Sequence, residues 1–534
     1  MPHYRTCLLS ALGAIALTTP AFSQMGHHGV ARLGTVDFQV ECAPASQQPF
    51  HTAMALYHSF AWSQAIAAFK AIAAADPACG MAHWGHAISI LDNPFIWPAG
   101  LTPQKLDTVI AALDAAKAAG LKTQREKDYV EATGTFVRDY ANRPYPERLQ
   151  AYDAAMGQLM ARYPNDTEAK VLSALITSAN FNPNDKSYGN QLRAVAVLEP
   201  LFKLHPNHPG IAHYLIHSYD YPPIAKQGLP AAKVYASIAP DAAHALHMPS
   251  HIFTRTGHWK ESIAANRESA RVAGDASFDG HHAADYVVYA YMQLAQDNAA
   301  RSAMKASLAL KPIDHFGSAF AYAAMPARVA LESGDWAAAT NLTLTPGESY
   351  PWNKYPQAEA INAFARGVGS ARSGNAAAAR AQQDRLGTLR EAARAARLAY
   401  WVEQIDIQAA VVGALALCAE GTQAECIDGL KAAAMREDAT EKHAVVPGPL
   451  LPARELLADM LLAQNKPADA LREYQAVMLK EPNRYRAVAG GMAAAIGTGD
   501  QALAKRLATE LAQLGAEADA QRASLTEAKR LTGG

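Results

Sequence analysis

Histidines recur in the middle of the chain at a spacing of 34 residues. The pair His213 and His217 is followed 34 residues later by the pair His247 and His251. A third step of the same length reaches one more histidine and an aspartate. A fixed period of this size is the signature of a repeat protein, in which equivalent positions of neighbouring units stack on one face. The spacing therefore predicts a row of metal-ligating side chains along adjacent helices.

The N-terminus has the pattern of a secretory signal. A short segment with Arg5 precedes an apolar run from Cys7 to Leu17, and small residues surround Ser23, where a signal peptidase would cut. The run is too short to span a bilayer, and no later stretch reaches about 18 uninterrupted apolar residues. We therefore expect residues 1–23 to be a cleaved signal peptide. The mature chain, divided into arrays at 24–300 and 301–534, is expected to be periplasmic or secreted, with no membrane span.

Four cysteines follow the predicted signal, an even number for an oxidising compartment. The two pairs lie far apart in sequence, which predicts that Cys42 is bonded to Cys79 and Cys418 to Cys426. A thiolate metal site is the alternative, but neither pair has the Cys-x-x-Cys spacing of zinc sites. The net charge of −1 offers no basic surface for nucleic acid, so the expected partners are proteins, peptides, small molecules or ions.

Apolar residues recur at helical rather than alternating spacing from end to end, which predicts an all-α fold. Three segments can be registered on a helix-pair pattern with small residues at helix contacts and proline closing the unit: Trp62, Ala65, Phe69 and Asp76-Pro77; Leu246, Ser250, Phe253, Gly257, Trp259 and Ser262; Ala470, Tyr474 and Glu481-Pro482. By these residues the chain resembles the tetratricopeptide-repeat superfamily, which implies a right-handed superhelical solenoid. The amino-acid sequences of residues 244–253 and 481–486 are similar to those of a group of bacterial secreted repeat proteins.

The resemblance also implies which face the histidines occupy. In tetratricopeptide repeats the first helix of each unit lines a concave groove, and this register places His244, His247, His251 and Arg255 there, with His213 and His217 in the preceding unit. Residues three, four and seven apart share one face of a helix, so the spacing agrees. Pro249 conflicts locally, because a proline inside a helix removes a backbone hydrogen bond.

A third helix is expected to add His281, His282 and Asp285 beside the same groove. Its turn comes late, so the register slips by about one helical turn, and whether His281 or His282 faces inward stays open. Asp220 is expected to complete or orient the ligand set, and Tyr214 to contribute to the groove.

Neutral imidazole is a common ligand of zinc, copper and iron, and two histidines one turn apart can chelate one ion. Ten of the 19 histidines fall between His205 and His282, which favours a metal site there. Two other interpretations stay open: a polar groove that binds a partner without metal, and ordinary packing of buried histidines.

Recognised catalytic motifs are lacking in the sequence, so catalytic residues stay unassigned. Residues 213–217 do not form His-Glu-x-x-His, and no Gly-x-Ser-x-Gly, Walker or dinucleotide-binding motif occurs, so no nucleotide cofactor is expected. Two classes of function follow. One is a metalloprotein, with oxidoreductase or hydrolase activity open, and the other is a scaffold that holds a protein, peptide or small ligand in the groove.

Overall fold

The computed structural model describes residues 31–97, 100–274 and 277–533. The predicted signal peptide, residues 1–23, lies outside these ranges. Helices and turns account for the regular structure of the described residues, and no β-strand occurs among them. The prediction of an all-α fold is therefore confirmed.

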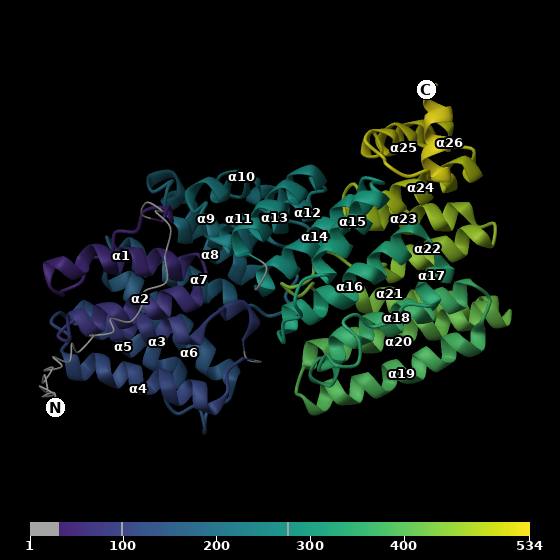
Figure 1. The fold of residues 1–534 in the computed structure, drawn as a ribbon. Coiled ribbons are helices and arrows are strands. Elements are labelled where there is room, and N and C mark those ends of the chain that lie inside the picture. The colour runs from purple at the N-terminus through teal and green to yellow at the C-terminus, as the bar shows by residue number, and fades with distance from the viewer. Residues whose placement is uncertain (1–30, 98–99, 275–276, 534) are drawn as a thin grey trace, which may run out of the picture.

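The helices run in chain order from the first helix, shown in purple in Figure 1, to the last, shown in yellow. The N-terminal helices are α1 (Pro44–His58), α2 (Trp62–Ala75), α3 (Gly80–Leu91), η1 (Pro94–Ile96), α4 (Pro103–Ala119), α5 (Gln124–Val137), α6 (Tyr145–Arg162), α7 (Thr167–Ala179) and α8 (Gly189–Leu204). The middle of the chain forms α9 (Pro209–Tyr219), η2 (Ala225–Gly228), α10 (Leu229–Ile238), α11 (Ala243–His247), α12 (Pro249–Arg255), α13 (Trp259–Ala273), α14 (Phe278–Gln293), α15 (Asp297–Leu308) and α16 (Phe316–Ser333). The remaining helices are α17 (Trp336–Thr340), η3 (Trp352–Lys354), α18 (Pro356–Arg372), α19 (Ala376–Ala395), α20 (Ala399–Glu420), α21 (Gln423–Ala439), α22 (Ala453–Ala463), α23 (Pro467–Lys480), α24 (Tyr485–Thr498), α25 (Gln501–Leu514) and α26 (Ala523–Thr532).

Consecutive helices pack against each other along most of the chain, and contacts also join next-but-one helices such as α14 with α16, α16 with α18 and α18 with α20. This is the contact pattern of a solenoid, in which each helix pair stacks on its neighbours. Figure 1 shows α14 and α16 in the middle of the array, between the helices of the two halves. The helical-repeat solenoid predicted from the sequence is thus the observed architecture.

Small residues sit where the helices of a unit touch. Phe69 of α2 packs onto Gly85 of α3, where a β-carbon would come within 2.3 Å of the ring. Tyr474 of α23 packs onto Gly490 of α24 in the same way, and its ring would lie 2.2 Å from a β-carbon. The glycine follows the aromatic residue by the same interval in both units. Helix pairs near both ends of the chain therefore pack through the same aromatic–glycine contact, as expected for a repeated structural unit.

The two halves meet where the turn after α23 contacts the turn after α12. The indole Nε1 of Trp259 donates to the carbonyl of Asn483 at 2.9 Å, and the amide of Asn483 donates to the carbonyl of Gly257 at 3.1 Å. Gly257 has φ +70° and a β-carbon there would lie 2.5 Å from the carbonyl of Pro482, so only glycine fits. The turn that follows residues 244–253 is thus in contact with residues 482 and 483.

Among the described residues, α20 is the one helix long and apolar enough to cross a membrane by length and composition. In the structure it packs against α18, α19 and α21.

Both disulfides link the cysteines that the sequence pairs, Cys42 with Cys79 and Cys418 with Cys426. The first closes a loop with a sequence separation of 37 residues and the second one of 8.

Loss of the first bridge is expected to destabilise the protein more than loss of the second, because a longer loop restricts the unfolded chain more. The loop-entropy relation gives about 4 kcal/mol for the longer loop and about 2.5 kcal/mol for the shorter one. Urea unfolding of C42S/C79S and C418S/C426S against the oxidised wild type measures both. Equal losses, or a larger loss in C418S/C426S, would contradict the expectation.

Candidate metal centre

Four helices bring the predicted histidines together. His213 and His217 lie on α9, His244 and His247 on α11, His251 on α12, and the third helix of the series is α14. The proline that conflicts with a helix there divides it into α11 and α12. Pro249 takes the first position of α12, where its missing N–H is not needed, and Met248 keeps a helical conformation with φ −53° and ψ −38°. His251 therefore still follows His247 by one turn.

The first group of candidate ligands consists of His213, His217 and His244. One ring nitrogen from each lies within 4.8 Å of the others, and the Nε2 atoms of His213 and His244 are 3.2 Å apart. The Nε2 atom of His217 is buried without any hydrogen-bond partner. Three imidazoles from α9 and α11 thus converge on one point.

The second group consists of His247, His251 and His282, again with ring nitrogens within 4.8 Å of one another. The Nε2 atoms of His247 and His251 are 3.0 Å apart. Two nitrogens at the usual 2.0–2.1 Å from one ion, with an angle of 90–110° between them, lie about 2.9–3.4 Å apart. The Nε2–Nε2 distances of His213 with His244 and of His247 with His251 match that geometry.

The hydrogen bonds on the far side of the rings show which nitrogens carry protons. Nδ1 of His251 lies 2.9 Å from a carboxylate oxygen of Asp220, and Nδ1 of His247 lies 2.6 Å from Oδ1 of Asn266. The amide orientation of Asn266 is set by its Nδ2, which donates to the carbonyl of Ser262 at 2.7 Å. Both oxygens are acceptors, so each Nδ1 donates and each neutral ring leaves a bare lone pair on Nε2. These two lone pairs face each other across 3.0 Å.

The same argument from the Nδ1 acceptor applies to the first group. Nδ1 of His213 lies 2.6 Å from the backbone carbonyl of His58, an obligatory acceptor, so its Nε2 carries a lone pair, which lies 3.2 Å from Nε2 of His244. Nε2 of His217 is buried without a hydrogen-bond partner, and a buried nitrogen of this kind costs about 1–3 kcal/mol. A cation between the lone pairs removes that cost, and supporting acceptors of this kind are the usual partners of metal-bound histidines.

Protonation of the imidazoles does not readily take the place of that cation. Burial, together with the neighbouring imidazoles, lowers the pKa well below the ordinary value for five of the rings: His213, His217, His244, His247 and His282. Burial also lowers the pKa of His251, assisted by the charge of Lys442. The six rings are therefore neutral at pH 7, the state that binds metal.

Aromatic rings fix the orientation of the imidazoles. Phe95 stacks on His217 with ring centroids 3.9 Å apart, and Phe60 stacks on His244 at 5.2 Å. In the second group Tyr286 contacts His247 edge-on at 4.7 Å, and its hydroxyl lies 3.4 Å from Nε2 of His251. Rings held on one face by hydrogen bonds and on another by aromatic packing have little freedom to turn away.

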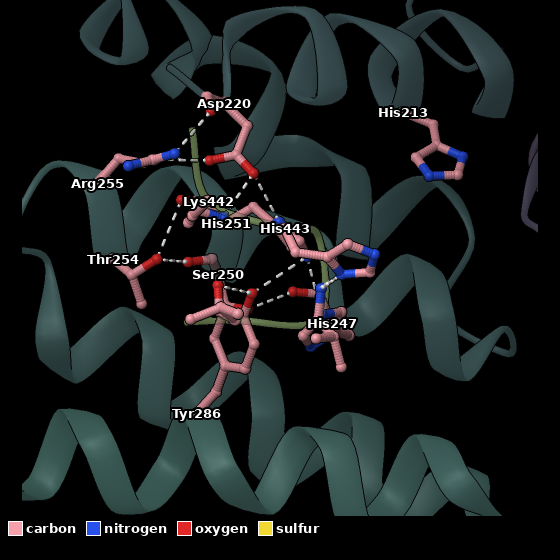
Figure 2. A network of polar contacts seen from close by, with 12 residues as sticks. His213, Asp220, His247, Ser250, His251, Thr254, Arg255, Tyr286, Lys442 and His443 are labelled. Atoms are coloured by element: carbon pink, nitrogen blue, oxygen red, sulfur yellow. Dashed lines mark hydrogen bonds and ion pairs between the residues drawn. The ribbon is translucent and has the colours of Figure 1, made fainter. Parts of the chain in front are cut away.

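The carboxylate of Asp220, at the C-terminal end of α9, forms hydrogen bonds with three side chains, as Figure 2 shows. Nδ1 of His251 lies 2.9 Å from Oδ2, Nε of Arg255 donates to Oδ1 at 2.9 Å, and Nζ of Lys442 donates to Oδ2 at 2.7 Å. Burial alone would raise the pKa of Asp220, but the charges of Lys442 and Arg255 and the bond to His251 outweigh it and hold that pKa well below its usual range. Burial lowers the pKa of Lys442 to about 8. The carboxylate therefore stays ionised and orients His251.

A segment from the C-terminal half covers the cluster. Lys442 contacts Asp220, the hydroxyl of Tyr286 donates to the carbonyl of Val446 at 3.4 Å, and Arg328 donates to the carbonyl of Gly448 at 3.1 Å. The sequence places the histidines on an open groove, but here they are enclosed: His213 is 0% exposed and His251 2%. Nothing local in the sequence around Lys442 marks it as part of the site, because its partner Asp220 precedes it by more than two hundred residues.

The third helix contributes differently from the expectation. His282 joins the second group, which settles the open choice, while His281 lies 3.1 Å from Ser318 and 3.3 Å from the hydroxyl of Tyr322. Asp285, expected beside the metal, instead forms a fully buried ion pair with Arg328 at 2.7 Å. A carboxylate held by a guanidinium at that distance is not free to ligate an ion.

Tyr214, expected in the groove, is fully buried and bonds to His58 instead. Its hydroxyl lies 2.8 Å from Nδ1 of His58, whose Nε2 lies 2.8 Å from Glu168. Glu168 also meets Nε2 of His208 at 2.6 Å. Burial would raise the pKa of Glu168, but the two histidines outweigh it and lower it well below its usual value. Every polar side-chain atom of Tyr214, His58, Glu168 and His208 has a hydrogen-bond partner. These residues therefore fix the position of His58, whose backbone carbonyl accepts from His213.

Arg255 and Lys442 also line a cavity of about 140 Å³. Its wall includes the aromatic residues Phe364, Tyr400 and Trp401, and no histidine appears among the described residues that line it. Nε2 of Gln404 and Oε1 of Gln408, which also line it, are buried without hydrogen-bond partners. The cavity is thus lined by both aromatic and charged residues and contains polar atoms without hydrogen-bond partners.

No protein-family model matches this chain, and no curated protein matches it either. Among solved structures, it is similar to that of Naa15/Naa10 bound to HypK-THB, with 12% identity over 91% of this chain and 91% of that chain and a TM-score of 0.25. It is also similar to the TPR domain of P58(IPK), with 11% identity over 92% of this chain and 98% of that one and a TM-score of 0.22. Likenesses at these TM-scores do not support a shared function.

Proposed function

We propose that this protein is a metal-binding protein whose six clustered histidines hold transition-metal ions. The observation that carries the proposal is the pair of Nε2 lone pairs of His247 and His251, which face each other at 3.0 Å while both Nδ1 atoms are engaged by acceptors. In a metal-free protein this arrangement is repulsive and buried. With a cation between the rings it becomes a chelate, and Asp220 supplies the supporting carboxylate.

The donor set favours copper and zinc. All six nitrogens belong to neutral imidazoles, and the nearest carboxylate, Asp220, orients a ring rather than facing the ligand nitrogens. Imidazole suits zinc, copper, iron and nickel, whereas calcium and magnesium require oxygen ligands. Among divalent ions copper binds such sites most tightly. Three histidines per group leave a coordination position open, as in catalytic rather than structural sites.

The two disulfides support export to an oxidising compartment, as the N-terminal pattern predicts. There the buried cluster would acquire its ions after translocation.

Removing one ligand from each group tests the proposal. Protein purified without an affinity tag is expected to contain copper or zinc, measured by elemental mass spectrometry. The variant H217A/H251A is expected to lose most of this metal on dialysis against a weak chelator. The matched control is H83A/H86A, which removes two half-buried histidines from α3, outside the cluster.

Three results are informative. Loss of metal from H217A/H251A with retention in H83A/H86A supports the cluster as the site. Wild-type protein that takes up no stoichiometric metal at neutral pH, or equal retention by both variants, rejects it. Circular dichroism of each variant shows whether the helical fold is intact before metal is measured.

A second candidate function is a scaffold that binds a small ligand or partner. The cavity beside Arg255 and Lys442 favours it, because the unpaired amides of Gln404 and Gln408 lie among aromatic walls. If the cluster holds no metal, the scaffold function is the one that the structure favours.

A further inference from the structure

The two groups of histidines are neighbours and share one helix. His244 belongs to the first group and His247 to the second, although both lie on α11 with ring centroids 6.1 Å apart. His217 and His251 face each other across the groups in the same way, at 6.2 Å. Two separate contacts therefore join the groups along their length.

We propose that the two groups form one dinuclear centre, in which each ion takes three histidines and a small anion from solvent bridges the two ions. The inference rests on the proposed metal-binding function and deepens it. An ion lies about 2 Å from each ligand nitrogen, so rings of the two groups that are 6 Å apart bring two ions close enough to share a ligand. Two-metal sites in enzymes hold their ions about 3.5–4 Å apart.

The charge balance identifies the bridging ligand as an anion. All six protein ligands are neutral, so two ions would add two to four uncompensated positive charges in a buried space. The carboxylate nearest the ligands, Asp220, is already paired with Arg255 and Lys442. Bound ions lower the pKa of water towards 7, which makes hydroxide available as the bridge. The open position on each ion, facing the other group, is where it would bind.

The ligand type favours copper over zinc in this centre, because divalent copper binds nitrogen sites more tightly than zinc does. The chemical class of ligand expected between the ions is therefore a small oxygen or nitrogen anion, for which hydroxide and azide are suitable probes.

Copper loading with electron paramagnetic resonance tests the inference. Chelator-treated wild type, reloaded with Cu(II), is expected to bind two ions per chain, and most of their spin signal should be missing because a hydroxide bridge couples the two ions. Added azide is expected to perturb the spectrum by competing for the bridge. This measurement needs no variant and so does not depend on the folding of an altered chain.

Two variants isolate the ions one at a time. His244 and His282 are half-buried, less enclosed than the other four ligands, and each belongs to a different group. H244A and H282A are each expected to keep one tightly bound Cu(II), now with its full spin signal. The signal per copper should therefore rise severalfold in both variants relative to wild type.

The outcomes separate this inference from the proposed function. Two coppers per wild-type chain with full, independent signals would overturn the dinuclear centre while leaving metal binding in place. One copper per wild-type chain would overturn it as well. No bound copper or zinc at all would reject the proposed function itself.

Discussion

Chelator-treated protein is expected to lose stability steeply as the pH falls below about 6.5. In the folded chain burial lowers the pKa of the cluster histidines, five of them well below the ordinary value. In the unfolded chain the same groups titrate near 6.5. Below that pH the unfolded state therefore binds more protons than the folded state, and unfolding becomes more favourable.

The expected slope is large because the contributions add. Each such histidine contributes up to about 1.4 kcal/mol per pH unit once the pH is below 6.5, and His443, whose pKa burial lowers to about 4, adds to the effect. Urea midpoints at pH 7.5 and pH 5.5 measure the difference. The variant H247L/H251L removes two titrating groups and is expected to show a shallower dependence. A wild-type midpoint that is the same at both pH values would show that the rings are not buried as neutral groups.

Replacing Asp220 by asparagine is expected to cost about 3–5 kcal/mol of stability, the range for breaking a buried ion pair from one side. The change leaves Arg255 and Lys442 buried, with side-chain exposures of 4% and 9%, and without their carboxylate. The same change replaces the charged acceptor of His251 Nδ1 by a neutral amide, and losses of this kind lower metal affinity about 10–100-fold. Urea unfolding measures the first effect and competition with a chelator the second.

Two comparisons make the result specific. The control E517Q breaks the exposed pair between Glu517 and Lys260, in which both side chains are 62% exposed, and should cost no more than about 1 kcal/mol. The double variant D220N/K442M removes the carboxylate and one stranded charge together, so it should recover part of the stability but not the metal affinity. If D220N were as stable as E517Q, Asp220 would not be the anchor of the covering segment.

Much of the fold could be predicted from short-range patterns. The 34-residue period requires equivalent positions on stacked helices, and the side chains of His213, His217, His247 and His251 do lie in two neighbouring groups. The pairing of Cys42 with Cys79 and of Cys418 with Cys426 follows from sequence proximity, because short loops are easy to close. Helical periodicity was sufficient for the all-α solenoid, since it depends only on neighbours three and four residues apart.

The grouping of the ligands was decided by the tertiary structure. The period predicts pairs across helices, such as His213 with His247, whereas the structure groups His213 and His217 with His244, and His247 and His251 with His282. The difference arises because ring direction depends on how far each helix is rotated about its own axis. On α14, His282 joins His247 and His251, while Asp285 pairs with Arg328.

The enclosure of the site also came from the tertiary structure alone. The sequence by itself determined the solenoid, the position of the histidine-rich units and the cysteine pairs, because these depend on local spacing. Lys442 reaches Asp220 only because the C-terminal half docks back on α9 and α14. Contacts between residues so distant along the chain leave no periodic trace in the sequence, and the burial that keeps the six imidazoles neutral exists only once those contacts have formed.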